Sequence, residues 1–250
     1  LFHHAWNSGQ SSGQSQLSAC VALMTMQLEP AAKPAKLGMG DALLLNAIAT
    51  AVDSDVDSLK DEYKRVGDLG TLVASRLDAL DAAAVAEMPE PLSVTELLGS
   101  IVELRDLTGK GKGSHSTKVE IVASLLRRCS PAEAQLLTRS IRGKSRAGVG
   151  QSVLLASLAQ AALLREPDRG GGARDDAKVE AKRRRDASEI VSNVFKTRPC
   201  YYQLVEELQL NGLGGLVVRP RAGVALQAMS AAPAKSVDEV FERFAPPVDA

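Results

Sequence analysis

Apolar residues recur three and four positions apart along most of the chain, which is the spacing of one face of an α-helix. The stretch from Val122 to Cys129 follows this spacing, and the pattern continues from Val149 to Leu164 with many alanines, which are strong helix formers. No alternation of apolar and polar residues with hairpin turns occurs before residue 210. The pattern therefore predicts an all-α, multi-helix fold.

The expected helix starts carry a specific capping signal. Four S/T-x-x-E boxes begin at Ser93, Thr117, Ser130 and Ser236. In such a box the hydroxyl accepts a hydrogen bond from a backbone N–H of the first turn, and the glutamate reaches back to the cap residue. Pro131 follows Ser130, and proline is favoured at the first helical position. We expect a helix to begin at each of these four boxes.

Changes in composition divide the chain into three parts. We expect residues 1–36 to be a disordered or truncated N-terminal segment, residues 37–212 to be a helical domain with a Gly-rich connector at about 166–178, and residues 213–250 to be a tail. The tail should contain short extended segments at 216–218 and 224–226, because a Gly-rich stretch ends the helical pattern before them. The first residue is Leu1, so we expect a fragment or an incomplete gene model.

The charges are balanced overall but unevenly distributed. Thirty Lys and Arg match thirty Asp and Glu. Residues 41–106 hold fourteen acidic and five basic side chains, whereas residues 109–148, which we call the basic window, hold nine basic and two acidic ones. A local excess of positive charge is typical of a surface that faces a polyanion. The neutral total therefore does not exclude nucleic-acid binding.

Other features of the composition exclude several classes of protein. No apolar run approaches the roughly 18 residues of a membrane span, so we expect a soluble chain without a membrane partner. Cys20, Cys129 and Cys200 are scattered and odd in number, which suits a reducing compartment and provides no disulfide framework or zinc spacing. Aromatic residues make up only 3%, too few for a base-stacking platform.

The most informative segment, residues 139–150, reads RSIRGKSRAGVG and joins two expected helices. Its glycines let backbone N–H groups approach a ligand, and the next helix presents unpaired donors with a partial positive charge, which together suit a phosphate. The alternative is a solvated basic turn, because glycine is also the normal end of a helix. We call this segment the second entrance.

Residues 109–118, GKGKGSHSTK, repeat this combination ahead of the helix expected at Thr117; we call them the first entrance. They are not a P-loop, because neither Gly-Lys pair has a glycine five residues before its own glycine and no strand precedes them. The alternative here is a flexible Gly/Lys loop. Two such entrances in one basic window favour a shared phosphate-binding face.

Catalytic signatures are missing. His115 has no Cys or Asp companion for a triad or metal site. The acidic stretch 53–62 lacks the glycine and glutamate of a calcium loop and is better explained as a solvated helix start. The run from Lys182 to Arg185 is interpreted as a solvated helix face, with nuclear import or backbone contact as the alternative. We therefore expect a binding module with no catalytic residue and no metal ligand.

Several segments, in unbroken order, resemble the N-terminal DNA-binding domain of ATP-dependent DNA ligases, with the replicative nuclear type as the nearest fit. They are LGMGDALL from Leu37, YKRVGDLG from Tyr63, PLSV from Pro91, STK from Ser116 and RSIRGKSRAGV from Arg139. The tail from Gly223 resembles the start of the family's nucleotidyltransferase domain, which would lie mostly outside this sequence.

The resemblance implies an all-α domain that grips nicked duplex DNA from its minor-groove side, mainly through phosphates and sugars. Such contacts position a protein without reading base sequence. By motif position, the expected DNA contacts are Arg142, Gly143, Lys144, Arg146 and Gly148 in the second entrance, and Lys112, Ser116, Thr117 and Lys118 in the first.

The sequence departs from the family in two respects. Ser145 and Ala147 stand where the family has bulkier apolar residues, and alanine or serine replaces family residues at 222, 225, 228 and 230. The first pair loosens the packing expected beneath the second entrance. The family's K-x-D-G-x-R motif, whose lysine attacks ATP, does not occur in the sequence.

Together these features predict the DNA-binding part of a nuclear ATP-dependent DNA ligase that joins nicks during replication, repair and recombination. The full-length enzyme would use ATP and Mg²⁺, whereas this chain should bind neither and be inactive alone. We expect a monomer that binds nicked double-stranded DNA, with replication or repair proteins as partners through other regions. The alternative is a non-catalytic helical interaction scaffold derived from a ligase domain.

Overall fold

Helices dominate the computed structural model, which confirms the expected all-α class. The structure describes residues 10–11, 14–28, 35–80, 90–109, 111, 113–143, 148–165, 177–220, 222 and 236–237. Ahead of the first described helix, two-residue strands β1 (Gln10–Ser11) and β2 (Gln14–Ser15) pair antiparallel, with Gln10 opposite Ser15.

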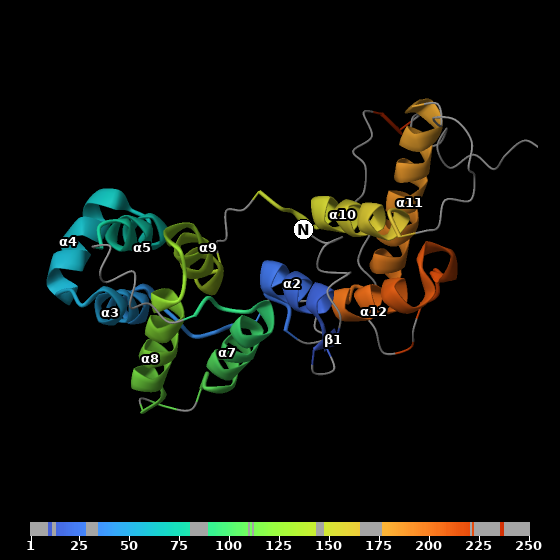
Figure 1. The fold of residues 1–250 in the computed structure, drawn as a ribbon. Helices are drawn as coiled ribbons and strands as arrows, with labels where there is room; N and C mark the ends of the chain where they lie inside the picture. Colours follow the sequence, from blue (N-terminus) through green and yellow to red (C-terminus); the bar gives the residue numbers. More distant parts are fainter. Residues whose placement is uncertain are drawn as a thin grey trace, which may run out of the picture.

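The described helices form two lobes, each with its own hydrophobic core (Figure 1). The first lobe contains α3 (Asp41–Val52), α4 (Val56–Val66), α5 (Leu69–Asp78), α7 (Val94–Asp106), α8 (Gly113–Arg127) and α9 (Pro131–Ile141). In it α5 packs along α9, and α3 packs along α8. Leu44, Ile48 and Leu126 are fully buried between these helices.

The second lobe is built from helices at both ends of the described chain. It contains α2 (Gln16–Thr25), α10 (Gln151–Leu163), α11 (Ala177–Thr197), α12 (Tyr201–Asn211) and the 3-10 turn η1 (Leu213–Gly215). Helix α10 packs along α11, and the rings of Phe195 and Tyr201 lie 4.4 Å apart between α11 and α12. The run from Lys182 to Arg185 lies on α11, as expected of a helix face, whereas most of the connector before this helix lies outside the described residues.

Helix α2 lies within residues 1–36 and corrects the expectation of disorder for residues 16–25. Ser15 caps this helix by accepting from the Ser18 N–H at 3.1 Å. Leu17 and Val21 are buried in the second core, and Met26 after the helix is buried in the first. The polar composition of the first residues concealed this helix, because the apolar partners of Leu17 and Val21 lie more than 130 residues further along the chain.

The capping boxes have mixed outcomes. Those at Ser93 and Ser130 are confirmed, with hydroxyl and glutamate bonds both present and Pro131 in the first turn of α9. The box at Thr117 is wrong, because α8 already begins at Gly113 and Thr117 lies inside it. Only residues 236 and 237 are described in the fourth box, so the glutamate of that box lies outside the described residues.

The described part of the tail stays attached to the second lobe. Leu213 of η1 is buried in the second core. Arg198 pairs with Glu207 at 2.7 Å and donates to the Val217 carbonyl at 3.3 Å. Leu216 has extended backbone angles, yet residues 216–220 belong to no strand, and the second expected segment, 224–226, lies outside the described residues.

Membrane crossing finds no support in the described helices, since none is both long and apolar enough to span a bilayer.

Candidate nucleic-acid interface

The first entrance turns through two glycines and then starts α8. Gly109 and Gly111 have φ of +87° and +88°, a left-handed backbone that favours glycine. The Ser114 N–H donates to the Gly111 carbonyl at 3.2 Å, and the Ser114 hydroxyl donates to the same oxygen at 2.7 Å. This turn closes the chain one helical turn before Thr117, which is why the helix begins earlier than its sequence box indicates.

The expected contact residues of the first entrance have different environments. Ser116 and Thr117 are exposed in the first two turns of α8, and the Ser116 hydroxyl donates to the Gly113 carbonyl at 3.3 Å. Lys112 lies outside the described residues. Lys118 is only 2% exposed. The expectation that Lys118 reaches a phosphate at the surface is therefore corrected.

Lys118 instead joins three segments of the first lobe. Its Nζ donates to the Leu37 carbonyl at 2.6 Å and to the Thr108 Oγ1 at 2.9 Å. Both acceptors are neutral, and burial lowers the pKa of the Lys118 ammonium below its ordinary value. The ammonium lies beside the C-terminal end of α7, where the helix dipole favours a cation.

The second entrance begins at the end of α9 and leads into α10. Gly143 and Gly148 are exposed and have φ of +76° and +67°. Lys144 and Arg146, between them, lie outside the described residues. Gly150 is the N-cap of α10 and offers no side-chain acceptor to the first-turn N–H groups, and no acidic side chain lies in that turn. The partial positive charge at the start of α10 therefore favours an anionic ligand.

Arg142, the fifth expected contact of the second entrance, is held within the fold. One of its guanidinium nitrogens donates to Asp41 Oδ2 at 2.6 Å, and the Tyr63 hydroxyl donates to the same oxygen at 2.9 Å. The guanidinium also lies 5.9 Å from the centre of the Tyr63 ring, within cation–π range. Arg142 thus links the end of α9 to the first residue of α3 and to the last turn of α4. These contacts hold it, so it does not point freely toward a ligand.

Arg139, which opens the second entrance, is also paired inside the first lobe. Its Nε lies 3.2 Å from both carboxylate oxygens of Asp68, and its guanidinium donates to the Thr71 hydroxyl at 3.2 Å. Burial opposes ionisation of Asp68, but the Thr71 N–H, which donates to Asp68 Oδ1 at 3.0 Å, and the Arg139 guanidinium together hold the pKa of Asp68 below its ordinary value. At Gly70 a Cβ would come within 2.8 Å of the Gln135 carbonyl. Only glycine allows α5 and α9 to approach this closely.

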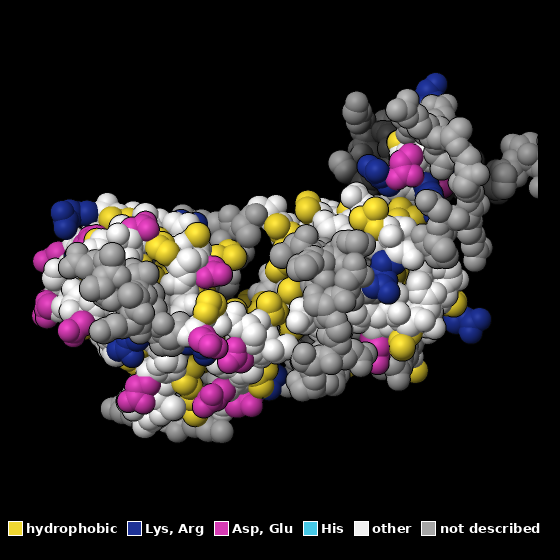
Figure 2. Space-filling view, viewed as in Figure 1, with side chains coloured by type: hydrophobic (Ala, Val, Ile, Leu, Met, Phe, Trp, Pro, Cys, Tyr) yellow, Lys and Arg dark blue, Asp and Glu magenta, His cyan; other side chains and the backbone are white. Residues whose placement is uncertain are grey.

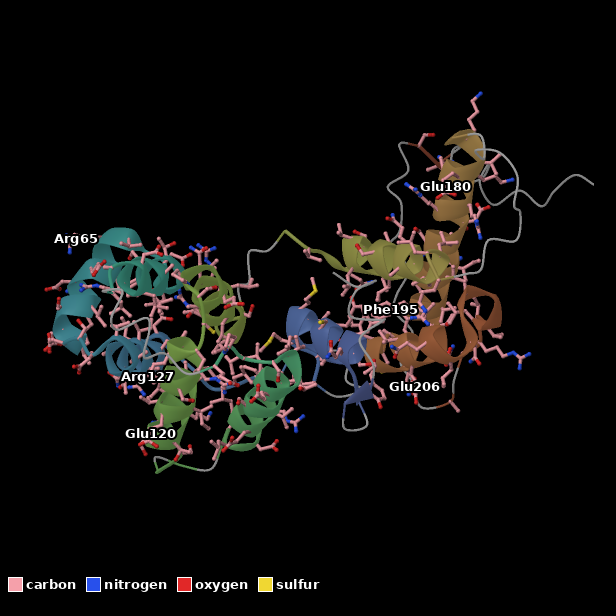
Figure 3. The ribbon with its side chains drawn as sticks, viewed as in Figure 1. Arg65, Glu120, Arg127, Glu180, Phe195 and Glu206 are labelled. Carbon is pink, nitrogen blue, oxygen red and sulfur yellow. The ribbon has the colours of Figure 1, made fainter. Side chains whose placement is uncertain are left out.

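The remaining described bases of the basic window are also engaged. Arg127, the last residue of α8, donates to the Thr50 carbonyl at 2.5 Å and so joins α8 to α3 (Figure 3). Arg128 donates to the Glu90 carbonyl at 2.8 Å. All five described bases of the window therefore bond to other parts of the fold, three of them to the acidic residues 41–106 through side chains.

This pairing changes the interpretation of the charge pattern. Much of the acidic and basic asymmetry is neutralised inside the first lobe, and acidic side chains remain frequent on the face of that lobe seen in Figure 2. Sequence reasoning missed Asp41 and Asp68 as partners of the basic window. The only available signal was the acidic excess itself, which does not say which acid meets which base.

The two entrances are not brought together. Helix α8 begins at the lower edge of the first lobe, whereas α10 begins between the lobes (Figure 1). A shared pocket for one phosphate is therefore not formed. An extended polyanion such as a duplex, with a charge about every 1.7 Å of its axis, can still bridge separated sites.

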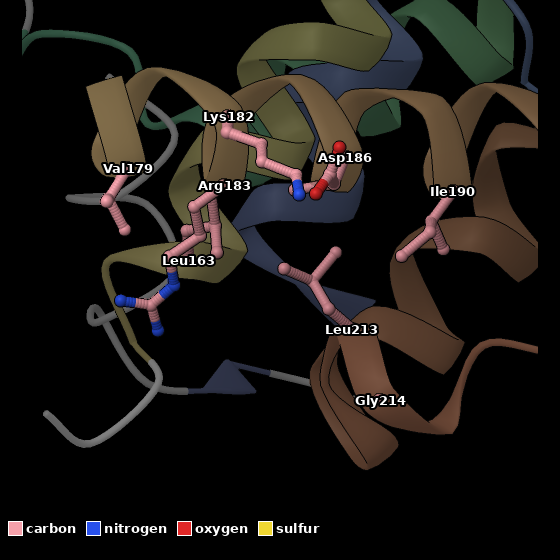
Figure 4. A pocket seen from close by; sticks show the side chains of 9 residues that line it. Leu163, Val179, Lys182, Arg183, Asp186, Ile190, Leu213 and Gly214 are labelled. Atoms are coloured by element: carbon pink, nitrogen blue, oxygen red, sulfur yellow. The ribbon is translucent and has the colours of Figure 1, made fainter. Parts of the chain in front are cut away.

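Two cavities are present in the described residues, and one of them borders the second entrance. An apolar groove of about 290 Å³ between α2, α7 and α9 is lined by residues that include Leu97, Leu136 and Val149. Figure 4 shows a second cavity, of about 450 Å³, where Lys182 and Asp186 of α11 lie near η1. Among the described residues, neither cavity is lined by an expected DNA contact.

Comparison with known proteins identifies the family. Residues 3–159 match the family model described as the DNA ligase N terminus, a range that includes α2 and both entrances. The chain is 28% identical over 213 residues to DNA ligase 1 of Saccharomyces cerevisiae, covering 84% of this chain and 27% of that protein. It is 28% identical over 232 residues to DNA ligase 1 of Schizosaccharomyces pombe, covering 92% and 29%.

An archaeal relative is equally similar. A DNA ligase of Saccharolobus islandicus is 27% identical over 215 residues, covering 83% of this chain and 32% of that protein. The chain thus spans less than a third of the length of these relatives. Because the family model covers more than half of the chain, this protein belongs to the DNA ligase N-terminus family.

Proposed function

We propose that this chain binds nicked duplex DNA through the sugar–phosphate backbone, as the DNA-gripping part of a ligase. The observation that carries this proposal is the family match over residues 3–159, which spans both glycine-flanked helix starts. Backbone N–H groups at a helix start and small residues beside them suit phosphate oxygens. Such contacts give affinity with little preference for base sequence.

The proposed contacts fall into two groups. In the second entrance, Gly143 and Gly148 let the backbone approach the DNA, and Lys144 and Arg146 supply positive charge. In the first entrance, Ser116 and Thr117 donate hydroxyls, and Lys112 adds charge. Arg142 and Lys118, whose donors are used inside the fold, act by holding the entrances in place.

The whole ligase is proposed to join nicks in duplex DNA during replication, repair and recombination, in the nucleus, with ATP and Mg²⁺. In the described residues, no group of three or more His, Cys, Asp or Glu side chains could hold a metal ion, and the sequence has no K-x-D-G-x-R lysine. We therefore assign adenylation to other parts of the enzyme. Residues 213–250 would begin the nucleotidyltransferase domain.

Paired charge removal tests the proposed interface. Lys144→Ala with Arg146→Ala should weaken binding to a nicked duplex and make the dependence of log K on log salt shallower by roughly 1.8, because about 0.9 is lost per phosphate contact. The measurement is fluorescence anisotropy of labelled nicked duplex at several salt concentrations.

The matched control removes two positive charges far from both entrances. Lys64 and Arg65 lie on α4, and Figure 3 shows Arg65 at the far end of the first lobe. Lys64→Ala with Arg65→Ala should leave the salt dependence nearly unchanged. If both double variants lose affinity equally, binding follows net charge, and the second entrance is not the interface.

The alternative function is a monomeric helical scaffold that binds protein partners such as replication or repair factors. The bonding of all five described bases of the basic window to other groups of the fold favours it, since those bonds compete with a phosphate for the same donors. Absence of duplex binding by the wild-type chain at low salt would decide for the scaffold.

A further inference from the structure

The segment from Leu37 to Asp41, which we call the strap, touches the supports of both entrances. At one end the Leu37 carbonyl accepts hydrogen bonds from Lys118 Nζ at 2.6 Å and from the Thr108 hydroxyl at 2.9 Å. At the other end Asp41 accepts from Arg142 at 2.6 Å. Thr108 directly precedes the first entrance, and Arg142 lies at the start of the second.

The strap has little freedom to shift at its first end. Gly38 has φ of +62°, and a Cβ there would lie 2.9 Å from Lys118 Nζ and 3.2 Å from Thr108 Cγ2. Leu37 and Met39 are buried in the first core on either side of Gly38. The Thr108 hydroxyl also bonds to the Leu104 carbonyl at 3.1 Å. The end of α7, the strap and α8 are thus packed around one ammonium group.

The Asp41 end of the strap is also held by hydrogen bonds. Asp41 is the first residue of α3, and its carboxylate also accepts from the Tyr63 hydroxyl at 2.9 Å. A carboxylate bonded to a guanidinium is among the stronger polar contacts. A displacement of the strap at Leu37 therefore reaches Arg142 through four intervening peptide bonds.

We propose that the strap is a positioning element that sets the two entrances relative to one another, through Lys118 and Thr108 at one end and Asp41 and Arg142 at the other. Two separated phosphate seats bind one duplex well only when their spacing matches it. The proposal rests on the proposed function, because it assigns the strap a role in DNA binding.

Thr108→Val is the most direct variant, because it removes a hydroxyl without changing volume much or altering charge. It should weaken nicked-duplex affinity about fivefold while leaving the salt dependence unchanged, since no phosphate contact is lost. Stoichiometric titration should show that every protein molecule in the sample of the variant still binds DNA. A loss of competent molecules with an unchanged Kd would instead indicate a merely structural role and would overturn the proposal.

The matched control is Thr50→Val, on an exposed threonine of α3 whose hydroxyl donates to the Asn46 carbonyl within the same helix. It should leave affinity unchanged. Lys118→Met provides a second check: weaker affinity with an unchanged salt dependence supports positioning. A salt dependence shallower by about 0.9 would make Lys118 a phosphate contact and contradict the proposal.

Amide hydrogen exchange without DNA separates this proposal from the function itself. Thr108→Val should speed exchange at residues 38–40 and also at residues 141–143, at the far end of the strap. Faster exchange confined to the neighbourhood of Thr108 would overturn the coupling. Failure of the wild-type chain to bind any duplex would instead contradict the proposed function. The exchange result would still decide whether the strap couples its two ends.

Discussion

Lys118 is the residue whose role changed most between sequence and structure. It lies in a Gly/Lys/Ser segment that indicates a surface contact, yet its partner Leu37 is 81 residues away in sequence. Arg142 meets Asp41 across 101 residues. Local composition cannot reveal such partners, because the burial of a charged group depends on which distant backbone oxygens the fold brings to it.

Burial gives Lys118 a measurable signature in alkaline solution. Its folded-state pKa lies below the ordinary 10.5. Between these two values the unfolded chain binds more protons than the folded one, so this group makes the free energy of unfolding rise with pH. The Lys118→Met variant lacks this contribution. Denaturant titrations at several pH values in this interval should therefore show its free energy of unfolding rising less steeply with pH than that of the wild type.

An exposed lysine provides the control for this measurement. A hydrogen bond from Lys60 to Asp57 raises the pKa of Lys60, so its contribution to stability falls with pH and Lys60→Met should not flatten the rise. If the free energy of unfolding rises with pH equally in the wild type and in Lys118→Met, the ammonium of Lys118 is not buried in solution.

At the scale of elements, sequence reasoning succeeded where the signal is local. Ser93 and Ser130 cap α7 and α9 as predicted, because a capping box needs only residues within one turn. The box at Thr117 failed since the Gly111–Ser114 turn starts α8 earlier. The close approach of α5 and α9 at Gly70 was not predictable, because glycine inside a helix alone does not say which neighbour needs the space.

The confirmed box at Ser130 and the failed box at Thr117 predict losses of stability of different size when the hydroxyl residue is replaced by alanine. Ser130→Ala should lower the free energy of unfolding by about 1 kcal/mol, because it leaves first-turn N–H groups of α9 without their acceptor. Thr117→Ala should change it by less than about 0.5 kcal/mol, the usual range for an exposed position. Urea titration of both variants checks this, and an equal loss would mean that α8 begins at Thr117 in solution.

The whole molecule joins segments that the sequence order separates. Helix α2 completes the second lobe, whose other helices lie after residue 150, and also packs on α7 of the first lobe. The all-α class was predictable from the apolar periodicity. The packing of α2 against helices that follow residue 150 was not, because the polar composition of the first residues is also typical of disorder. The two separated entrances likewise follow from the lobes and not from the spacing of glycines.

A pair of leucine variants tests the place of α2. Leu17 is fully buried and Leu210 is 74% exposed. Leu17→Ala should lower the free energy of unfolding by about 3 kcal/mol through lost burial and a cavity, whereas Leu210→Ala should change it by less than about 0.5 kcal/mol. Thermal and urea unfolding measure both, and a negligible effect of Leu17→Ala would remove α2 from the core.

The central claim is that DNA binding uses the entrances and not the whole basic window. Five of its nine bases bond to other groups of the fold, and the proposed phosphate contacts take their positive charge from Lys112, Lys144 and Arg146. The most direct test is the affinity of the wild-type chain for a nicked duplex as a function of salt. We predict a slope of log K against log salt of about −2.7, from three charged contacts; a slope near −8, or no binding at low salt, would contradict the account.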